Sequence, residues 1–211
     1  MNKRSSKTDK RLATKQKICK YAVNMFYKNG TKSVKMDDIS AKLKISKRTL
    51  YEIFEDKEQL LLECMIYKVE AEHNDLANFV HNEAQNVMQI IIKFYEIRME
   101  IIKKISPVFY SDLERYPKVR RYLKEHSISE RNRSVQFFKR GVEDGYFIPE
   151  LNYDIVTRIG EAYMDYIMQK RLYDEYPMNE IFLNFISVIV RGFCTEEGKE
   201  MLKKFLEEHK A

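Results

Sequence analysis

The chain has 211 residues, of which 44% are hydrophobic and 33% charged, the usual mix for a packed protein of one or two domains. Its 6 Gly and 4 Pro are too few for a sandwich or barrel with many tight turns, whereas abundant Lys, Glu, Leu and Met favour helices. No run approaches the roughly 18 apolar residues of a membrane span, no secretory signal is recognisable, and the 3 Cys lie far apart, so we expect a cytoplasmic protein.

The formal net charge of +6 is unevenly distributed along the chain. Residues 1–57 hold 16 Lys/Arg against 6 Asp/Glu, a net charge of +10, and residues 58–211 carry a net charge of −4. A small basic head on a mildly acidic body is what a polyanionic partner such as nucleic acid requires. A Lys-rich surface that only aids solubility is the alternative at this point.

Residues 1–10 are polar and basic and are expected to be disordered. After them, apolar residues recur at helical spacing, with Asn29-Gly30 as a C-terminal cap signal and with Ser46 and Asp56 as N-caps. The N-terminal segments expected as helices are 14–29, 36–43, 47–54 and 56–82.

The rest of the chain is expected to form further, mostly long helices. Pro107, Pro117 and Pro177 separate several of them, and Thr195 is the predicted N-cap of the last, with Glu196 in its first turn. The expected segments are 83–106, 107–115, 117–144, 152–173, 178–193 and an amphipathic helix after Thr195.

Residues 36–54 have the size and pattern of a helix-turn-helix, because two short helices are joined by about three residues. So small a pair needs the helix over 14–29 as a third wall. The second helix of the pair carries polar side chains on its outer face, and long cations and hydroxyls there suit phosphates and base edges of a major groove. A merely solvated three-helix head is the alternative. The polar residues are Lys47, Arg48, Thr49, Tyr51 and Glu52, and the inward apolar ones are Ile39, Leu43, Ile45, Leu50 and Phe54.

The N-terminal region resembles the DNA-binding head of the TetR-type (tetracycline-repressor-like) regulators, almost without gaps from about residue 11 to about 65. The C-terminal half resembles the family more weakly, through GYFI at 145–148 and VRGF at 190–193 followed by TEEG at 195–198. The segments that carry the N-terminal resemblance are TKQKI at 14–18, AVNMFYKNG at 22–30, MDDI at 36–39, ISKRTLY at 45–51 and DKEQLL at 56–61.

The resemblance implies an all-α fold with a three-helix helix-turn-helix head and a larger helical domain for ligand binding and dimerisation. The expected division is a disordered tip over 1–10, a DNA-binding domain over 11–71 and an effector-binding and dimerisation domain over 72–211. The implied function is transcriptional repression by a homodimer on a near-palindromic double-stranded DNA operator, with release when an unknown small-molecule effector binds. A helical protein-interaction adaptor without specific DNA binding is the rival hypothesis, which salt-dependent DNA affinity would separate.

The resemblance also assigns DNA contacts. Lys47, Arg48 and Thr49 occupy positions that read bases or hold phosphate, and Tyr51 matches an aromatic that meets the backbone. Two residues depart from the family: Lys44 stands where Gly is usual in the turn, at a cost of roughly 1 kcal/mol if it is left-handed, and Lys35 stands where Ser or Thr often begins the second helix. The predicted DNA-binding residues are Lys35, Lys44, Ser46, Lys47, Arg48, Thr49, Tyr51 and Lys57.

The body contains the expected effector pocket and dimer interface. The chain's 14 Tyr, 12 Phe and 10 Met favour a deformable apolar cavity, although any one aromatic at helical spacing is more often part of the core. The helices at 152–173 and 178–193 are expected to form a four-helix contact across a two-fold axis. The pocket candidates are Met65, Tyr95, Met99, Phe109, Tyr110, Phe137, Tyr163 and Met164.

Metal and catalytic chemistry have little support in the sequence. Glu70 and His73 form one Glu-x-x-His motif, but a di-iron site needs two such motifs and two further glutamates. There is no glycine-rich phosphate loop, no nucleophile elbow and no Cys/His cluster. We therefore expect no enzyme activity, no metal and no cofactor.

Overall fold

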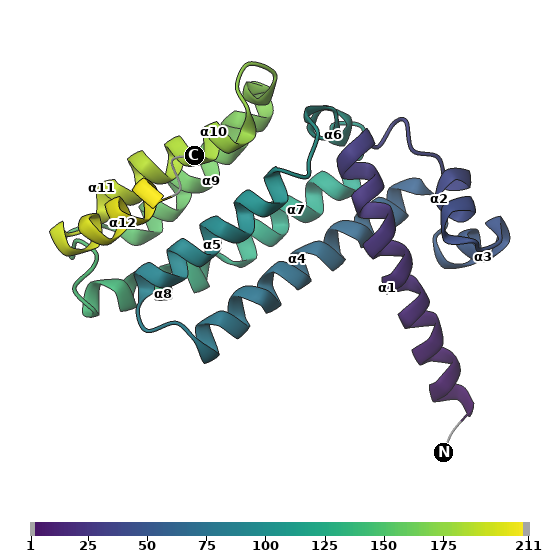
Figure 1. Cartoon of the computed structure of the whole chain (residues 1–211), viewed down its shortest axis with the longest axis horizontal. Coiled ribbons are helices and arrows are strands. Elements are labelled where there is room, and N and C mark those ends of the chain that lie inside the picture. Colours follow the sequence, from purple (N-terminus) through teal and green to yellow (C-terminus); the bar gives the residue numbers. More distant parts are fainter. Residues whose placement is uncertain (1–2, 209–211) are drawn as a thin grey trace. The chain divides into compact units, whose positions relative to one another are not determined.

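The computed structural model describes residues 3–208, and the regular elements within that range are helices joined by loops and turns (Figure 1). No strand occurs within these residues, where β pairing is confined to a single bridge between Phe147 and Cys194. This confirms the all-α fold class, and the scarcity of Gly and Pro is its cause.

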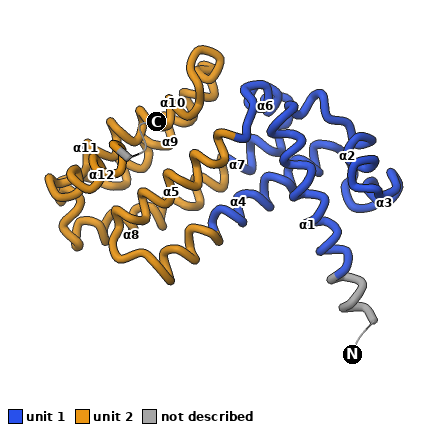
Figure 2. Tube along the Cα trace, in the orientation of Figure 1, with its two compact units in different colours: residues 1–73, 104–123 blue, residues 74–103, 124–211 orange. Residues whose placement is uncertain are grey.

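The chain divides into two compact units, shown in Figure 2, and each is described by itself. Unit 1 comprises residues 1–73 and 104–123, and unit 2 comprises residues 74–103 and 124–211. Unit 1 therefore combines the basic head with a segment that is distant in sequence.

Unit 1 is built on a buried apolar core to which each of its first three helices contributes. Ile18, Phe26, Ile39, Leu50 and Phe54 are at most 1% exposed, whereas Leu43 and Ile45 are half-buried at the turn. These buried residues confirm the prediction that the first helix packs against the helix-turn-helix pair. The helices are α1 (Lys3–Asn29), α2 (Met36–Leu43), α3 (Lys47–Ile53), the first part of α4 (Lys57–Asn82), α6 (Pro107–Leu113) and the start of α7 (Pro117–Ser129).

Helix α1 begins at Lys3, although the sequence favoured a start near Thr14 after a disordered tip. No Gly or Pro interrupts residues 3–13, and most of these residues have fair helix propensity, so a helix nucleated on the buried side of α1 continues toward the N-terminus. Residues 1–2 lie outside the described residues.

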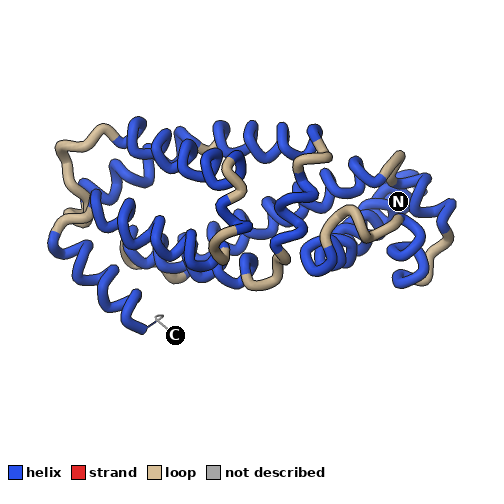
Figure 3. Tube along the Cα trace, turned by 90° about the horizontal axis from the view of Figure 1, so that it is seen from above, coloured by secondary structure: helices blue, strands red, loops and turns tan. Residues whose placement is uncertain are grey.

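Unit 2 is a helical bundle around a second, aromatic-rich core. Figure 3 shows the helices of the described chain and the loops between them. Phe147, Tyr153, Phe193 and Phe205 are buried there, and Phe147 and Phe193 meet edge to face with ring centroids 5.2 Å apart. The elements are the end of α4, α5 (Val87–Ile102), the end of α7, α8 (Arg131–Glu143), α9 (Tyr153–Gln169), the 3-10 turn η1 (Leu172–Asp174), α10 (Met178–Phe185), the π-helical η2 (Ile186–Val190), α11 (Arg191–Phe193) and α12 (Glu196–Glu208).

Two expected helices differ from the structure. The segment expected as one helix over 117–144 is broken at Glu130, where the Ser129 hydroxyl donates to the His126 carbonyl at 2.8 Å and competes with the helical backbone bonds. The helix expected from residue 83 begins instead at Val87, because the Asn86 side chain caps it by accepting from the Gln89 N–H at 3.0 Å.

The two C-terminal segments that carried the family resemblance lie together in unit 2. The Ile148 N–H donates to the Phe193 carbonyl at 3.0 Å, and the Thr195 N–H donates to the Tyr146 carbonyl at 2.9 Å. Thr195 also accepts from the Gly198 N–H at 3.3 Å, which confirms it as the cap of α12. These backbone hydrogen bonds therefore hold the loop before α9 and the loop before α12 together.

Candidate nucleic-acid interface

The helix-turn-helix is formed by α2, a tight turn and α3. At the turn, Lys44 has φ 55° and ψ 40°, so it takes the left-handed conformation in place of the usual Gly. The Ile45 N–H then donates to the Ser40 carbonyl at 3.1 Å, which closes the end of α2. Ser46 caps α3, as predicted, by accepting from the Thr49 N–H at 3.0 Å.

Helix α3 separates its faces clearly. Leu50 is fully buried against the core of unit 1, whereas Lys47, Arg48 and Tyr51 are exposed. The Tyr51 side chain is 50% exposed, which is unusual for so large an aromatic and leaves its ring available to a partner. The exposed face therefore carries two cations, an aromatic ring and the Ser46 and Thr49 hydroxyls, which lie 2.8 Å apart.

Both cations on this face have a carboxylate partner. The Lys47 ammonium lies 2.7 Å from Asp37, and the Arg48 Nε lies 2.8 Å from Glu52. These hydrogen bonds raise the pKa of Lys47 and of Arg48, so both side chains are charged at neutral pH. Since exposed pairs of this kind are weak, a phosphate or a base can displace the carboxylates.

Lys35 and Lys57 flank the motif. Lys35 is the N-cap of α2, where its N–H donates to the Asp38 carboxylate at 2.8 Å, while its own side chain makes no capping bond. Lys57 is the first residue of α4, and its ammonium donates to the Lys32 carbonyl at 3.4 Å. Burial lowers the pKa of Lys57, against the opposing effect of Asp112 and Asp38. Asp38 thus supplies the capping interaction that the departure at Lys35 had put in question.

Sequence reasoning missed several groups at this surface. Arg11 donates to the Glu52 carbonyl at 3.1 Å, which ties α1 to the end of α3. The pairing of Arg48 with Glu52 could have been read from their i, i+4 spacing. The contact between Asp37 and Lys47 crosses the turn between α2 and α3, and no local sequence pattern predicts it.

The predicted pocket residues are divided between the two units. Met65 and Phe109 are buried in unit 1, and Phe109 meets the neighbouring Tyr110 ring with centroids 6.1 Å apart. In unit 2, Tyr95 is buried in the aromatic core, and Met99 and Phe137 pack against it.

Tyr163 and Met164 lie on different faces of α9. The Tyr163 ring stacks on Phe185 at 4.8 Å, and its hydroxyl donates to the Ile181 carbonyl at 3.0 Å. Met164 is 42% exposed. Of the eight candidates, the structure therefore gathers Tyr95, Met99 and Phe137 in one cluster.

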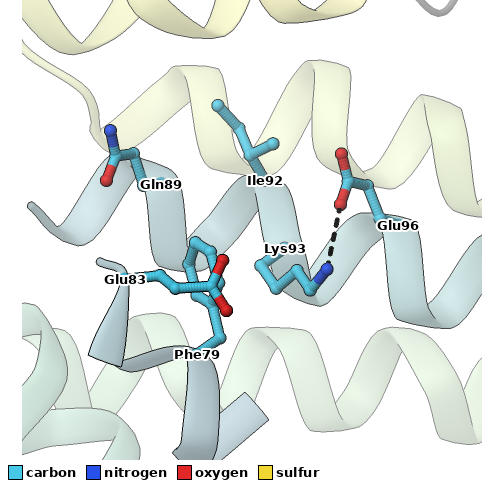
Figure 4. Close-up of a pocket in the computed structure, with 6 residues that line it drawn as sticks. All are labelled: Phe79, Glu83, Gln89, Ile92, Lys93 and Glu96. Carbon is cyan, nitrogen blue, oxygen red and sulfur yellow. Dashed lines mark ion pairs between the residues drawn. The ribbon is translucent and has the colours of Figure 1, made fainter. Parts of the chain in front are cut away.

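A surface pocket of about 310 Å³ lies at the junction of α4 and α5 in unit 2 and contains none of the predicted residues (Figure 4). Its polar groups already interact: the Lys93 ammonium is 3.6 Å from Glu96 and 5.5 Å from the Phe79 ring centroid, and Gln89 accepts from the Gln85 N–H. The Glu83 carboxylate also lines this pocket.

Helix α9 exposes an apolar stripe. Ile155, Ile159 and Tyr166, spaced at i, i+4 and i+11, are 53%, 49% and 54% exposed. Val188, in the π-helical segment of the following helix, is 66% exposed. Large apolar side chains in such a row are typical of a surface that another protein covers.

Two features of the described residues, 3–208, bear on other functions. No three His, Cys, Asp or Glu side chains in that range gather closely enough to hold a metal ion. None of the helices in the described part of the chain is both long and apolar enough to cross a bilayer.

A capped helix-turn-helix that presents an exposed cationic face is typical of DNA-binding transcriptional regulators. Residues 18–64 match the family model described as bacterial regulatory proteins, tetR family. The N-terminal head of the chain is therefore similar to the N-terminal domain of that family, in agreement with the resemblance of its N-terminal motifs.

Relatives of the chain carry the same fold. The transcriptional repressor KstR2 of Mycobacterium tuberculosis is 23% identical over 146 residues, which cover 67% of this chain and 72% of that protein. A TetR-family regulator from Cytophaga hutchinsonii has a TM-score of 0.64 at 15% identity, covering 89% of this chain and 98% of its own. The fatty acid degradation regulator FadR of Bacillus halodurans has a TM-score of 0.59 at 17% identity, covering 84% and 95%.

Proposed function

We propose that the protein is a homodimeric repressor that binds a near-palindromic operator and releases it when a small-molecule effector binds the body. The exposed pair of Lys47 and Arg48 on a capped α3 is the observation that carries this proposal. A helix with this face fits a major groove, where Arg recognises guanine through two hydrogen bonds and Lys holds phosphates. The site of action would be the cytoplasm, where the DNA of a bacterial cell lies.

The DNA-binding domain in this proposal spans about residues 11–71, after a basic tip over 1–10, and the effector-binding and dimerisation domain spans 72–211. The Ser46 and Thr49 hydroxyls and the Tyr51 ring lie on the same face as Arg48, so they would contact the backbone beside the base that Arg48 reads. Lys35, Lys44 and Lys57 would hold flanking phosphates. Lys57 is aided by its position at the N-terminus of α4, since the helix dipole favours an anion there.

Dimerisation would use α9 and the helix that runs from α10 through α11. The exposed stripe of Ile155, Ile159 and Tyr166 supports this assignment. Each such side chain would stabilise the dimer by about 1.5–3 kcal/mol if the interface buried it fully. A two-fold contact between these helices forms a four-helix bundle and fixes the spacing of the two heads.

The effector would bind among the aromatic and methionine side chains of the body. Tyr95, Met99 and Phe137 are the candidates that unit 2 gathers, and their chemistry suits a largely apolar molecule. The names of two relatives refer to ketosteroids and to fatty acid degradation, which points to the same class. The proposal includes no catalytic step, cofactor or metal.

The decisive experiment is selection of bound sites from random duplex DNA with the purified full-length chain. We expect a near-palindrome whose half-sites are centred about one helical turn, ~34 Å, or a small multiple apart. Affinity for that site should fall steeply as salt rises, because the protein's cations displace counterions. A chain that enriched no sequence and showed only weak, sequence-independent binding would instead be the helical adaptor.

A further inference from the structure

Asp112, on α6 of unit 1, is a buried carboxylate that the assigned function does not use. It is 7% exposed, and burying a charge costs free energy unless the charge is compensated. Its Oδ2 accepts from the N–H of Lys32 at 2.7 Å, and the two residues are 80 positions apart. The carboxylate therefore fixes the loop between α1 and α2 to α6.

The contact is close enough to constrain the loop sequence. Gly30 begins the loop with φ +77°, and a Cβ at this position would lie 2.8 Å from the Asp112 carboxylate and 2.7 Å from Val108. Only glycine satisfies both the conformation and the space.

A second connection fastens α6 to the end of α1. The Ser106 N–H donates to the Tyr27 carbonyl at 2.8 Å, and the Tyr27 ring meets Phe109 edge to face at 4.9 Å. Helix α6 thus lies against α1 within unit 1 (Figure 2). It is a fixed support for the loop that leads into the helix-turn-helix.

Lys32 joins this support to the predicted phosphate contact. Its N–H donates to Asp112, and its carbonyl accepts from the ammonium of Lys57. The negative charge of Asp112 also acts directly on that ammonium and favours its charged form against partial burial. The Asp112 carboxylate therefore orients Lys32, whose carbonyl accepts from Lys57, and it also favours the charged form of the Lys57 ammonium.

We propose that Asp112 is a positioning residue for DNA binding, which holds Lys32 and thereby places the charged ammonium of Lys57 at the N-terminus of α4 for a phosphate. The inference rests on the proposed function, in which Lys57 meets the DNA backbone. It adds that a residue of α6, outside the helix-turn-helix, determines how well that contact is made.

The test compares Asp112→Asn with Glu114→Gln in the full-length chain. Both variants remove one negative charge from the same end of α6, but Glu114 is exposed and does not contact the loop. Asp112→Asn keeps an oxygen that can accept from Lys32 but replaces a charged acceptor with a neutral one, so it should weaken binding to the selected operator by up to about tenfold. Glu114→Gln should bind as the wild type does or slightly more tightly.

The readout that separates positioning from stability is the salt dependence of binding. Lys57→Ala should lower the slope of log affinity against log salt by about 1 per site. Asp112→Asn should lower it similarly, and Lys57→Ala should then have little further effect in that background, because the contact is already lost. Where Asp112→Asn does not fold, Asp112→Ser removes the same charge with a smaller side chain.

Two results would overturn the inference while leaving the proposed function intact. In the first, Asp112→Asn binds the operator with the affinity and slope of the wild type. In the second, it weakens binding but Lys57→Ala still lowers the slope fully, so that Asp112 serves stability alone. Failure of the wild type to bind any duplex would refute the proposed function and this inference with it.

Discussion

Replacing Lys44 with Gly should stabilise the fold while weakening DNA binding. Lys44 is held at φ 55° in the turn between α2 and α3, a conformation that costs a residue with a Cβ about 1–2 kcal/mol. Glycine's extra freedom in the unfolded chain offsets about 0.4–1 kcal/mol of that gain. The net stabilisation is about 0.5–1 kcal/mol, which for a chain of this size raises Tm by about 1–4 °C.

The assay is thermal and urea unfolding of Lys44→Gly at fixed protomer concentration, because dimerisation makes Tm depend on concentration. Lys42→Gly is the matched control: Lys42 is exposed in the last turn of α2, where glycine should cost about 0.5–1 kcal/mol. The two variants lose the same charge two residues apart and should move in opposite directions. The reasoning about the turn is refuted if Lys44→Gly melts at or below the wild-type temperature. If Lys44 also meets a phosphate, its loss should lower the salt slope by about 1 per site.

Three further predictions concern the reading helix, the dimer and the core. Arg48→Ala should weaken operator binding by roughly 1–3 kcal/mol and relax selection at one base-pair position, whereas a uniform loss on every sequence would limit Arg48 to phosphate. Ile159→Asp should convert the dimer to monomers in sedimentation measurements, and an unchanged dimer would remove the α9 stripe from the interface. Burial raises the pKa of Cys194 from 9.0 to about 11, so native protein should react slowly with thiol reagents at pH 8, and fast labelling would contradict its burial. Because the unfolded thiol ionises at lower pH than the folded one, this group's stabilising contribution should be complete below about pH 9 and lost by about pH 11 in urea titrations.

The sequence predicted those parts of the fold that depend on neighbours in the chain. Ser46, Asp56 and Thr195 cap their helices as expected, because a capping bond joins residues two or three positions apart. The polar face of α3 followed equally from helical spacing, since Leu50 points inward and Arg48 outward. Interactions between neighbours in the chain were therefore sufficient to predict which face of α3 is polar and exposed.

Features that depend on distant contacts could not be predicted in this way. The pairing of Asp112 with Lys32 joins a helix to a loop 80 residues away in the sequence, and neither residue stands in a recognisable motif. The pocket residues could not be assigned for the same reason, because the burial of an apolar side chain depends on contacts distant in the sequence. Tyr95 and Met164 both lie at helical spacing, but one is buried in a core and the other is 42% exposed. Periodicity identifies an apolar face without saying whether it meets its own core, a ligand or a second copy.

We expect the carboxylates beside the exposed face of α3, those of Asp37 and Glu52, to affect the specificity of DNA binding more than its affinity. Asp37 and Glu52 pair with Lys47 and Arg48 in the free protein, and because these pairs are exposed they are weak. On random DNA, in the proposed complex, Arg48 gains no base contact and stays paired with Glu52, which offsets its attraction to the polyanion. At the operator, Arg48 leaves Glu52 for guanine, so the carboxylate matters less there. We therefore expect Glu52→Gln to raise affinity for random duplex DNA more than affinity for the operator, and so to lower the ratio between the two.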